Sequence, residues 1–201
     1  SLIVKNNFIL DSFDRKLIDL KKVLIPGNHN ILNILAAINV ALLLKIPIDE
    51  ISTKLYTFKG IEHRIEYVAN LKNVKYYNDS KATNIDSVIA AINSFKSPIT
   101  LILGGLDKGA DFKVLKKIIK KRKISIVAYG NAAERISTTL RDAANLFLTD
   151  KLKEAIEISN KVTHPGEIVL LSPGCASYDQ FLNFEQRGIF FKQTVKAFAT
   201  A

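Results

Sequence analysis

The sequence lacks the features that mark membrane, secreted and disulfide-bonded proteins. No apolar run is long enough to cross a bilayer, since the longest, residues 34–44, is interrupted by Asn39. The first residues do not have the basic-then-apolar layout of a signal peptide. The single cysteine, Cys175, excludes an internal disulfide and fits a reducing compartment. We therefore expect a soluble, cytoplasmic protein that does not associate with a membrane.

The chain also lacks an initiating methionine, because it begins at Ser1. We take this as the mark of an internal cut or of processing, so that the chain is expected to be one part of a longer protein. Its 201 residues, 48% of them hydrophobic, can bury a substantial core. The length predicts one domain, or one domain and part of another.

Acidic residues are outnumbered, with 19 Asp and Glu against 29 Lys and Arg and a formal charge of +10. Most of the positive charge is lysine, and the densest run, residues 116–123, lies where a helix is expected to end. No aromatic residues alternate with the basic ones to form a stacking surface for bases. We therefore expect no nucleic-acid partner. A basic nucleic-acid-binding module stays the less favoured alternative, and salt-dependent affinity for DNA would support it.

The pattern of apolar residues divides the chain near Gly60. Before it, residues 1–10 and 13–20 predict two strands, and Asn28 can cap a helix that runs to about Leu44. After it, near-continuous apolar strands alternate with helices, which predicts a Rossmann-like, mostly parallel α/β sheet. We predict two domains, 1–60 and 61–201. The expected strands of the second are 66–71, 74–77, 99–103, 124–129, 145–148 and 168–171, and its expected helices are 86–95, 112–121, 132–140, 151–161 and 180–198.

Three polar, glycine- and serine-containing loops follow strands of this sheet. They cover residues 78–84, 104–112 and 172–177. Because the carboxyl ends of parallel strands lie at one edge of the sheet, we expect the three loops to form one ligand-binding edge. Each loop also leads toward a helix, whose free N–H groups favour an anion.

The first loop places Asp79, Lys81 and Thr83 within five residues. This combination of carboxylate, ammonium and hydroxyl suits a nucleotide or a small anion, with Lys81 beside phosphate. The alternative is an N-capped turn in which Ser80 or Thr83 satisfies backbone donors and Lys81 is exposed to solvent. The loop alone does not decide between the two.

The second loop resembles a phosphate-binding P-loop but fails its pattern, because Lys108 is followed by Gly109 and not by Ser or Thr. We expect its glycines to let the backbone approach a ligand, and Lys108 to reach a carboxylate as a point charge. A turn with a solvated lysine is the competing interpretation.

The third loop contains Cys175, which could be considered as a nucleophile. Such a cysteine needs a histidine base, and none of the three histidines is clearly placed on this edge. A small packed thiol is therefore the favoured role. Ser177 is better placed to donate a hydrogen bond at the helix that follows.

Two further positions could contact a nucleotide. Asn30 and Asn33 are one helical turn apart, so they share a face and can present a donor and an acceptor to an adenine edge. The alternative is a helix cap with polar residues in solvent. Arg64, after the expected hinge, places a fixed positive charge where two domains could meet over a phosphate. We assign no metal site to this chain.

In these stretches the sequence resembles the Mur ligase family, and among its members those that add D-glutamate. The similar stretches cover nearly the full chain, and the combination of Asp-Ser-Lys-Ala-Thr-Asn with Ser-Pro-x-Cys-Ala-Ser is more specific than either alone. The resemblance implies an enzyme of three domains. This chain would hold the end of the central ATPase domain and the whole terminal Rossmann-like domain.

The resemblance also implies roles for individual residues. Contacts to ATP are implied for Asn30, Asn33, Arg64, Asp79 and Lys81, and Lys81 would also support catalysis. Contacts to D-glutamate are implied for Thr83, Lys108, Ser177 and Phe184, and for Tyr178 through its backbone. The UDP-binding domain, the P-loop and the Mg²⁺ ligands would lie upstream of this chain.

The implied reaction is carboxylate activation by ATP, with Mg²⁺ as cofactor. The terminal carboxylate of UDP-N-acetylmuramoyl-L-alanine would become an acyl phosphate, which the amine of D-glutamate attacks. We expect a monomer that is inactive on its own. The alternatives are a ligase similar to folylpolyglutamate synthase and a dinucleotide-binding Rossmann module, although no G-x-G-x-x-G follows a strand.

Overall fold

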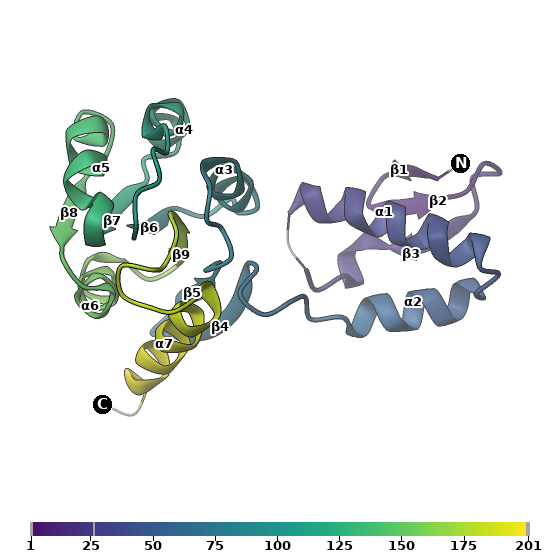
Figure 1. Cartoon of the computed structure of the whole chain (residues 1–201). Coiled ribbons are helices and arrows are strands. Elements are labelled where there is room, and N and C mark those ends of the chain that lie inside the picture. Colours follow the sequence, from purple (N-terminus) through teal and green to yellow (C-terminus); the bar gives the residue numbers. More distant parts are fainter. Residues whose placement is uncertain (1, 26, 200–201) are drawn as a thin grey trace. The chain divides into compact units, whose positions relative to one another are not determined.

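The computed structural model describes residues 2–25 and 27–199, so Pro26, at the predicted chain break, lies outside the described residues. The described chain forms two compact units, residues 1–60 and residues 61–201 (Figure 1). Each unit has its own buried core and is described by itself.

The first unit combines a three-stranded antiparallel sheet with two helices. Its strands are β1 (Ile3–Lys5), β2 (Phe8–Leu10) and β3 (Lys16–Asp19), and its helices are α1 (Asn28–Leu43) and α2 (Ile48–Thr57), with a 3₁₀ turn, η1 (Leu20–Lys22), between the sheet and α1. The single strand predicted over residues 1–10 is wrong. Asn6 and Asn7 have φ angles of 51° and 63°, which bend the chain into a tight hairpin turn.

Helix α1 begins one residue earlier than predicted. Gly27 occupies the N-cap position, so Asn28 is the first helical residue and not the cap. The core of this unit is small, and the buried members of its apolar cluster come from β2, β3 and α1: Ile9, Ile18, Ile34 and Ile38.

The second unit is a six-stranded sheet in the order β4-β5-β9-β6-β7-β8, and it confirms the predicted mostly parallel α/β fold. The strands are β4 (Glu66–Leu71), β5 (Val74–Asn78), β6 (Ile99–Gly104), β7 (Ser125–Tyr129), β8 (Leu146–Thr149) and β9 (Ile168–Gly174). Only β4 runs antiparallel to its neighbour. The helices are α3 (Ile85–Asn93), α4 (Lys116–Arg122), α5 (Ala133–Leu140), α6 (Leu152–Val162) and α7 (Phe184–Ala197), with the 3₁₀ turns η2 (Phe112–Leu115) and η3 (Gly130–Ala132).

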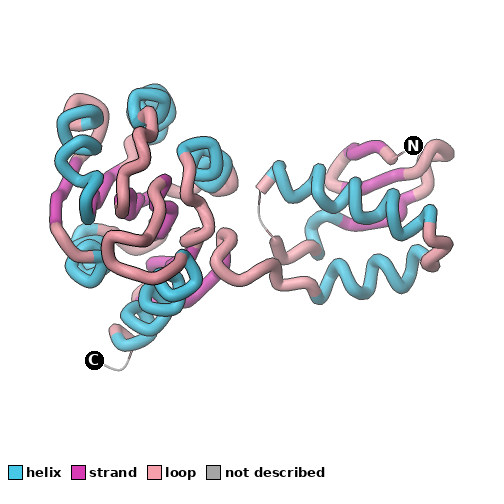
Figure 2. The backbone as a smooth tube through the Cα atoms, in the orientation of Figure 1, coloured by secondary structure: helices cyan, strands magenta, loops and turns pink. Residues whose placement is uncertain are grey.

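Helices cover both faces of this sheet, and alternate strand residues enter two separate cores. Leu101 and Leu103 point to the core formed with α3, α4 and α5, whereas Ile102 points to the core formed with α6 and α7. Figure 1 shows these two groups of helices on opposite faces, and Figure 2 shows the strands between them. This three-layer arrangement explains why the strands are apolar at nearly every position.

The largest departures from the predicted elements lie at the edge where a ligand site is predicted. β9 continues to Gly174, and α7 begins at Phe184 instead of Gln180. A tight turn fills the interval, because the Ser177 carbonyl accepts from the amides of Gln180 and Phe181. The predicted strands and helices elsewhere in this unit agree with the structure to within a few residues.

Two consecutive glycines at the end of β6 allow the backbone to approach that of the neighbouring segments closely. A Cβ atom on Gly104 would lie 2.0 Å from the Tyr129 carbonyl oxygen, and one on Gly105 would lie 2.4 Å from the Ala176 carbonyl oxygen. Their φ angles are +139° and +124°. We predicted that these glycines make room for a ligand, but the atoms that require them belong to the chain's own backbone.

We expect Gly105→Ala to lower the free energy of unfolding by more than about 3 kcal/mol, because backbone must move to accept the methyl group. Gly109→Ala is the matched control, since a Cβ there meets nothing within 4 Å. It should cost about 1–2 kcal/mol for its positive φ alone. Guanidinium unfolding followed by circular dichroism measures both, and equal losses would contradict the close approach.

Candidate functional site

The three polar loops do come together at one edge of the sheet. Their strands, β5, β9 and β6, are consecutive neighbours in the sheet. Hydrogen bonds join the loops directly: the Gly174 amide donates to the Ala82 carbonyl at 2.8 Å, and the Leu106 amide donates to the Ala176 carbonyl at 2.9 Å. The prediction of a shared edge is therefore confirmed.

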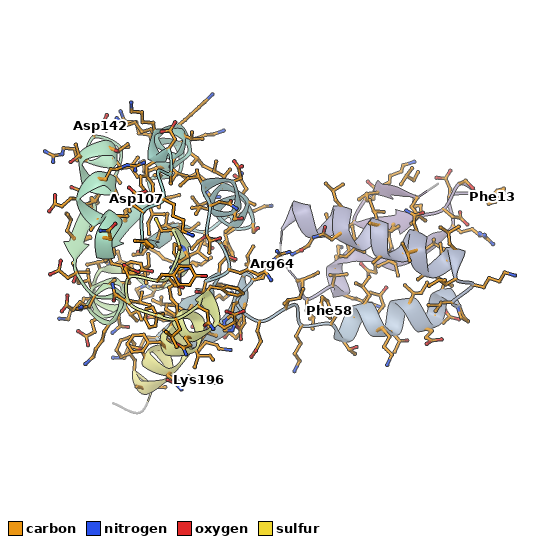
Figure 3. The ribbon with its side chains drawn as sticks, in the orientation of Figure 1. Phe13, Phe58, Arg64, Asp107, Asp142 and Lys196 are labelled. Atoms are coloured by element: carbon orange, nitrogen blue, oxygen red, sulfur yellow. The ribbon has the colours of Figure 1, made fainter. Side chains whose placement is uncertain are left out.

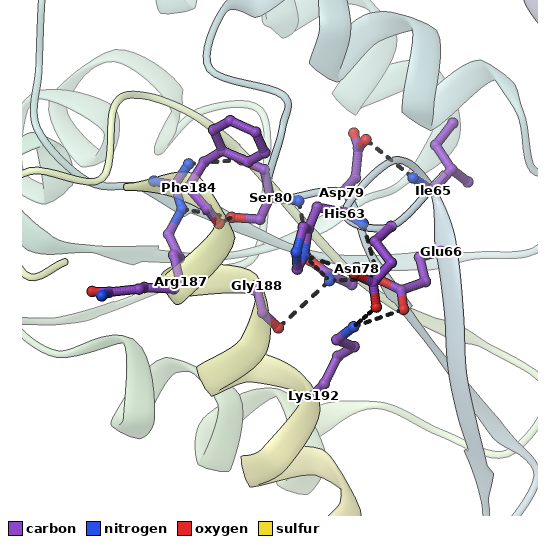
Figure 4. Close-up of polar contacts among 12 residues, drawn as sticks. His63, Ile65, Glu66, Asn78, Asp79, Ser80, Phe184, Arg187, Gly188 and Lys192 are labelled. Atoms are coloured by element: carbon purple, nitrogen blue, oxygen red, sulfur yellow. Dashed lines mark hydrogen bonds and ion pairs between the residues drawn. The ribbon is translucent and has the colours of Figure 1, made fainter. Parts of the chain in front are cut away.

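Arg187 of α7 binds these loops to one another, and sequence reasoning gave it no role. Its side chain is fully buried, with 0% exposed. Nε donates to the Ser80 hydroxyl at 2.9 Å, and the terminal nitrogens donate to the carbonyls of Ser80, Cys175 and Ala176 at 2.9–3.1 Å. Figure 4 shows the guanidinium beside Ser80. Among the described residues no carboxylate forms an ion pair with it, so backbone carbonyls compensate the buried charge.

Replacement of Arg187 by methionine should lower the free energy of unfolding by at least about 3 kcal/mol, since several buried acceptors lose their donor. Amide exchange at Ser80 and Ala176 should accelerate more than exchange in α5. Arg141→Met, at an exposed arginine, is the control and should change stability by less than about 0.5 kcal/mol. Unchanged exchange in the two loops would show that Arg187 does not hold them.

Asp79 fastens the start of the second unit to the middle of its sheet. Its side chain is 5% exposed; Oδ1 accepts from the Ile65 amide at 3.2 Å and Oδ2 accepts from the Ser172 hydroxyl at 2.8 Å. Burial raises the pKa of the Asp79 carboxyl to about 7, against the lowering effects of these two hydrogen bonds and of Arg64. Asp79 is therefore a brace between the segment that contains Arg64 and strands β5 and β9.

Because the folded pKa of Asp79 lies above its ordinary value of 3.8, the folded protein binds its proton more tightly than the unfolded chain. The stabilising contribution is present below about pH 4 and is lost as the pH rises through about 7. We expect this loss to be a few kcal/mol, at about 1.4 kcal/mol per pKa unit. Asp79→Asn should remove this loss of stability with pH, because an asparagine side chain does not titrate.

Guanidinium unfolding at pH 4.5, 6 and 7.5 compares the wild type with Asp79→Asn and with Asp86→Asn, an exposed control. The free energy of unfolding of Asp79→Asn, relative to that of the wild type, should increase as the pH rises. A difference that is the same at all three pH values would mean that Asp79 does not titrate in this range.

A polar network attaches the residues that follow Gly60 to α7. Lys192 Nζ lies 3.0 Å from Glu62 Oε1 and 2.9 Å from Glu66 Oε1. Asn78 Nδ2 donates to Glu66 Oε2 at 2.9 Å and lies 3.0 Å from His63 Nδ1 (Figure 4). Burial, and then the charge of Lys192, lower the pKa of His63, so this histidine is disposed to be neutral.

His63 corrects our statement that no histidine is clearly on this edge. Its ring packs edge-on against Phe184, with centroids 6.1 Å apart. Gly188 allows the approach, because a Cβ there would lie 2.2 Å from His63 Nδ1. Arg64, next in the chain, is exposed, and Figure 3 labels it.

The two predicted ligand lysines each lie over an aromatic ring. Lys81 Nζ is 5.3 Å from the centroid of Phe184, and Lys108 Nζ is 5.3 Å from the centroid of Tyr178. Both lysines are exposed, as are Thr83 and Tyr178, whereas Ser177 is buried. Each ammonium group thus has a preferred place while staying available to an anion.

The loop that carries Lys108 is braced by a residue that sequence reasoning missed. Arg135 of α5 donates to the Asp107 carboxylate and to the Ala110 carbonyl, and its guanidinium lies 5.2 Å from the Phe112 ring centroid. Asp107 also accepts from the Gly109 amide at 2.8 Å. An arginine far along the chain has no local signal that would connect it to this loop.

The helix N-termini at this edge are already capped. The side chain of Asn84 accepts from the Ser87 amide at the start of α3, and that of Asn183 accepts from the Gln186 amide at the start of α7. Asp111 does the same for Lys113 at η2. These side-chain caps occupy N–H groups that we expected to bind an anion. The positively charged side chains at this edge are therefore the better partners for an anion.

Cys175 is packed and not poised for reaction. Its side chain is buried, and burial raises the pKa of the thiol to about 12. This agrees with the favoured interpretation of a small packed residue. Among the side chains that the structure describes, no three His, Cys, Asp or Glu gather as a metal site would require.

In the first unit, Asn30 and Asn33 share a face of α1 as their spacing predicted. Asn33 Nδ2 donates to Asn30 Oδ1 at 3.4 Å. The two carboxamides thus lie together, with Asn33 exposed and Asn30 half-buried. None of the helices described is long and apolar enough to span a membrane.

The fold and the loop geometry agree with a known domain family. A family model described as "Mur ligase, glutamate ligase domain" matches residues 63–175, more than half of the chain. The chain belongs to the Mur ligase family. Two solved structures share its fold: UDP-N-acetylmuramate–alanine ligase of Thermotoga maritima (TM-score 0.64, 18% identity, 89% of this chain and 39% of that one) and a pseudomurein peptide ligase type C of Methanothermus fervidus (TM-score 0.67, 18% identity, 97% and 41%).

Curated relatives of this Mur ligase chain are much more similar in sequence. One, from Caldanaerobacter subterraneus, is 46% identical over 90% of this chain and 41% of its own length; another, from Clostridioides difficile, is 43% identical over 96% and 44%. Both are named UDP-N-acetylmuramoylalanine–D-glutamate ligase. The chain thus spans less than half the length of the relatives it matches.

Proposed function

We propose that this chain is the D-glutamate-binding part of a UDP-N-acetylmuramoylalanine–D-glutamate ligase, which acts in the synthesis of peptidoglycan precursors. The observation that carries the proposal is that two neighbouring loops each hold an exposed lysine over an aromatic ring: Lys108 over Tyr178, which can take a carboxylate of the amino acid, and Lys81 over Phe184, which can take phosphate. The hydroxyls of Thr83 and Ser177 are the further polar anchors that an amino acid needs to fix its amine. The names of the relatives supply the choice of D-glutamate.

In this proposal residues 61–201 form the D-glutamate domain and residues 1–60 the end of the ATP-binding domain. Lys108 binds a carboxylate of D-glutamate as a point charge, and the hydroxyls of Thr83 and Ser177 hydrogen-bond to the amino acid. Phe184 and Tyr178 contribute by holding the two ammonium groups in place. The amine then points away from the sheet toward the substrate to be joined.

The described residues fit ATP in part. The hydrogen-bonded pair Asn30 and Asn33 offers an adenine both a donor and an acceptor, and Arg64 and Lys81 offer phosphate two exposed positive charges. Asp79 contributes indirectly, because both of its oxygens already accept from the chain and it fixes the segment next to Arg64. Ligands for Mg²⁺ would come from residues outside this chain.

The proposed reaction forms an amide bond at the expense of ATP. ATP transfers its terminal phosphoryl group to the carboxylate of UDP-N-acetylmuramoyl-L-alanine, and the amine of D-glutamate displaces phosphate from the resulting acyl phosphate. This chain positions the nucleophile and supplies cations that offset charge on the transferring group. We expect the chain alone to bind but not to turn over.

Titration calorimetry of the chain with D- and L-glutamate tests the amino-acid site. We expect D-glutamate to bind at least 10-fold more tightly than L-glutamate, and Lys108→Ala or Thr83→Ala to weaken it by about 10-fold or more, the value of one lost charged contact. Lys113→Ala, at an exposed lysine of the next turn, is the control and should leave affinity unchanged.

A chimera tests the whole activity. The Caldanaerobacter relative, with its matched region replaced by residues 1–201, should release phosphate only when D-glutamate and UDP-N-acetylmuramoyl-L-alanine are both present. Lys108→Ala should lower kcat/KM for D-glutamate. Phosphate release that is indifferent to D-glutamate, or equal binding of both enantiomers to the chain, would overturn the proposal.

A further inference from the structure

Lys108 stands at the exposed tip of the loop of residues 104–112. Its side chain is exposed, and a Cβ on the following residue, Gly109, would meet nothing within 4 Å, so neighbouring groups do not restrict the backbone there. Glycine also permits more backbone conformations than any other residue. The place of the Lys108 ammonium group therefore depends on how the turn around it is held.

The carboxylate of Asp107, the residue before Lys108, closes this turn. Its Oδ1 accepts from the Gly109 amide at 2.8 Å and from the Ala110 amide at 3.3 Å. Its Oδ2 accepts from the guanidinium of Arg135. An aspartate that binds backbone amides two and three residues ahead defines a local turn, and this one depends on a single carboxylate group.

Arg135 holds the turn from both sides. One terminal nitrogen donates to the Asp107 carboxylate and the other donates to the Ala110 carbonyl, so the guanidinium bridges the two ends of the segment that contains Lys108. The planar fork of a guanidinium suits two acceptors at once, which an ammonium group does not. The guanidinium also lies over the ring of Phe112, which is 1% exposed. It thus rests on a buried side chain.

Helix α5 gives this clamp a rigid base. Ile136 and Leu140 of the same helix are fully buried in the core on one face of the sheet. The Arg135 side chain is 44% exposed, so its replacement opens no cavity in that core. Ion pairs of this exposure contribute little to global stability. The contacts of Arg135 are therefore expected to matter for the loop and not for unfolding.

The ion pair also controls the charge beside the proposed ligand lysine. Asp107 and Lys108 are neighbours in the chain, so an unpaired Asp107 carboxylate would repel an incoming carboxylate and compete with it for the ammonium group. Arg135 neutralises that carboxylate and turns it away from this competition. The lysine thereby stays available to an anion.

We propose that Arg135 is a positioning residue of the amino-acid site: it clamps the turn on both sides of Lys108, and by pairing with Asp107 it leaves the ammonium group available to a carboxylate of the substrate. The inference rests on the proposed function for the identity of that substrate, D-glutamate. The clamp itself is defined by contacts within the chain.

Titration calorimetry with D-glutamate compares the wild type with Arg135→Met, which keeps the stem of the side chain and removes its donors. We expect the affinity to fall about 10-fold, as for the loss of one charged contact. Arg135→Lys should restore only part of it, because an ammonium group does not bridge both acceptors. Arg141→Met, at an exposed arginine at the end of α5, is the matched control and should leave the affinity unchanged.

A double-mutant cycle separates an action through Lys108 from a general effect on the fold. In the chimera with the Caldanaerobacter relative, Arg135→Met should raise KM for D-glutamate about 10-fold and change kcat by less than about 2-fold. In a Lys108→Ala background the same substitution should have little further effect, because the group to be positioned is gone. Losses that simply add would overturn the proposal, as would a wild-type KM in Arg135→Met.

Amide exchange distinguishes a failure of this inference from a failure of the proposed function. Without any ligand, exchange at Gly109 and Ala110 should be at least about 10-fold faster in Arg135→Met, while exchange in β6 is unchanged. If the wild type binds neither enantiomer of glutamate, the role toward D-glutamate falls with the proposed function. Unchanged exchange at both amides would overturn the clamp, whatever the chain binds.

Discussion

The buried guanidinium of Arg187 is the interaction on which the edge formed by the three polar loops depends. An uncompensated charge in a protein interior costs several kcal/mol, so its position is fixed by the need to satisfy its donors. Here those donors are satisfied by carbonyls of two loops, at Ser80 and at Cys175 and Ala176. The loops in turn cannot move apart without exposing the charge to an apolar core. One side chain of α7 thereby sets the spacing of loops that are almost 100 residues apart in sequence.

A second set of contacts sets the beginning of the same unit. Asp79 holds the Ile65 amide, and Lys192 holds Glu62 and Glu66, so the segment after Gly60 is joined to both β5 and α7. Arg64 therefore projects from a rigid segment and not from a loose linker. In the proposed function, this rigid placement of the Arg64 charge lowers the entropy lost when it contacts phosphate.

The sequence predicted the sheet well because its signals are local. Apolar strands that alternate with helices indicate a parallel α/β sheet with few alternatives. The three polar loops at strand ends then predict which edge of the sheet they share. Prediction failed where a distant partner decides. The role of Gly105 depends on the Ala176 carbonyl, and the roles of Arg135 and Arg187 depend on loops elsewhere in the chain. The hairpin at Asn6 and Asn7 was missed for a local reason, the weak turn signal of an Asn-Asn pair.

The order of the strands has a consequence for how the chain acquires its structure. β9 is the last strand in sequence, yet it lies between β5 and β6 at the centre of the sheet. Until the ribosome has released residues 168–174, the two halves of the sheet have no hydrogen-bonding partner between them. Such late, non-local pairing slows folding and leaves strand edges open in the nascent chain. Synthesis of this domain is thus a period of vulnerability to aggregation that ends only when its carboxyl-terminal strand has been inserted.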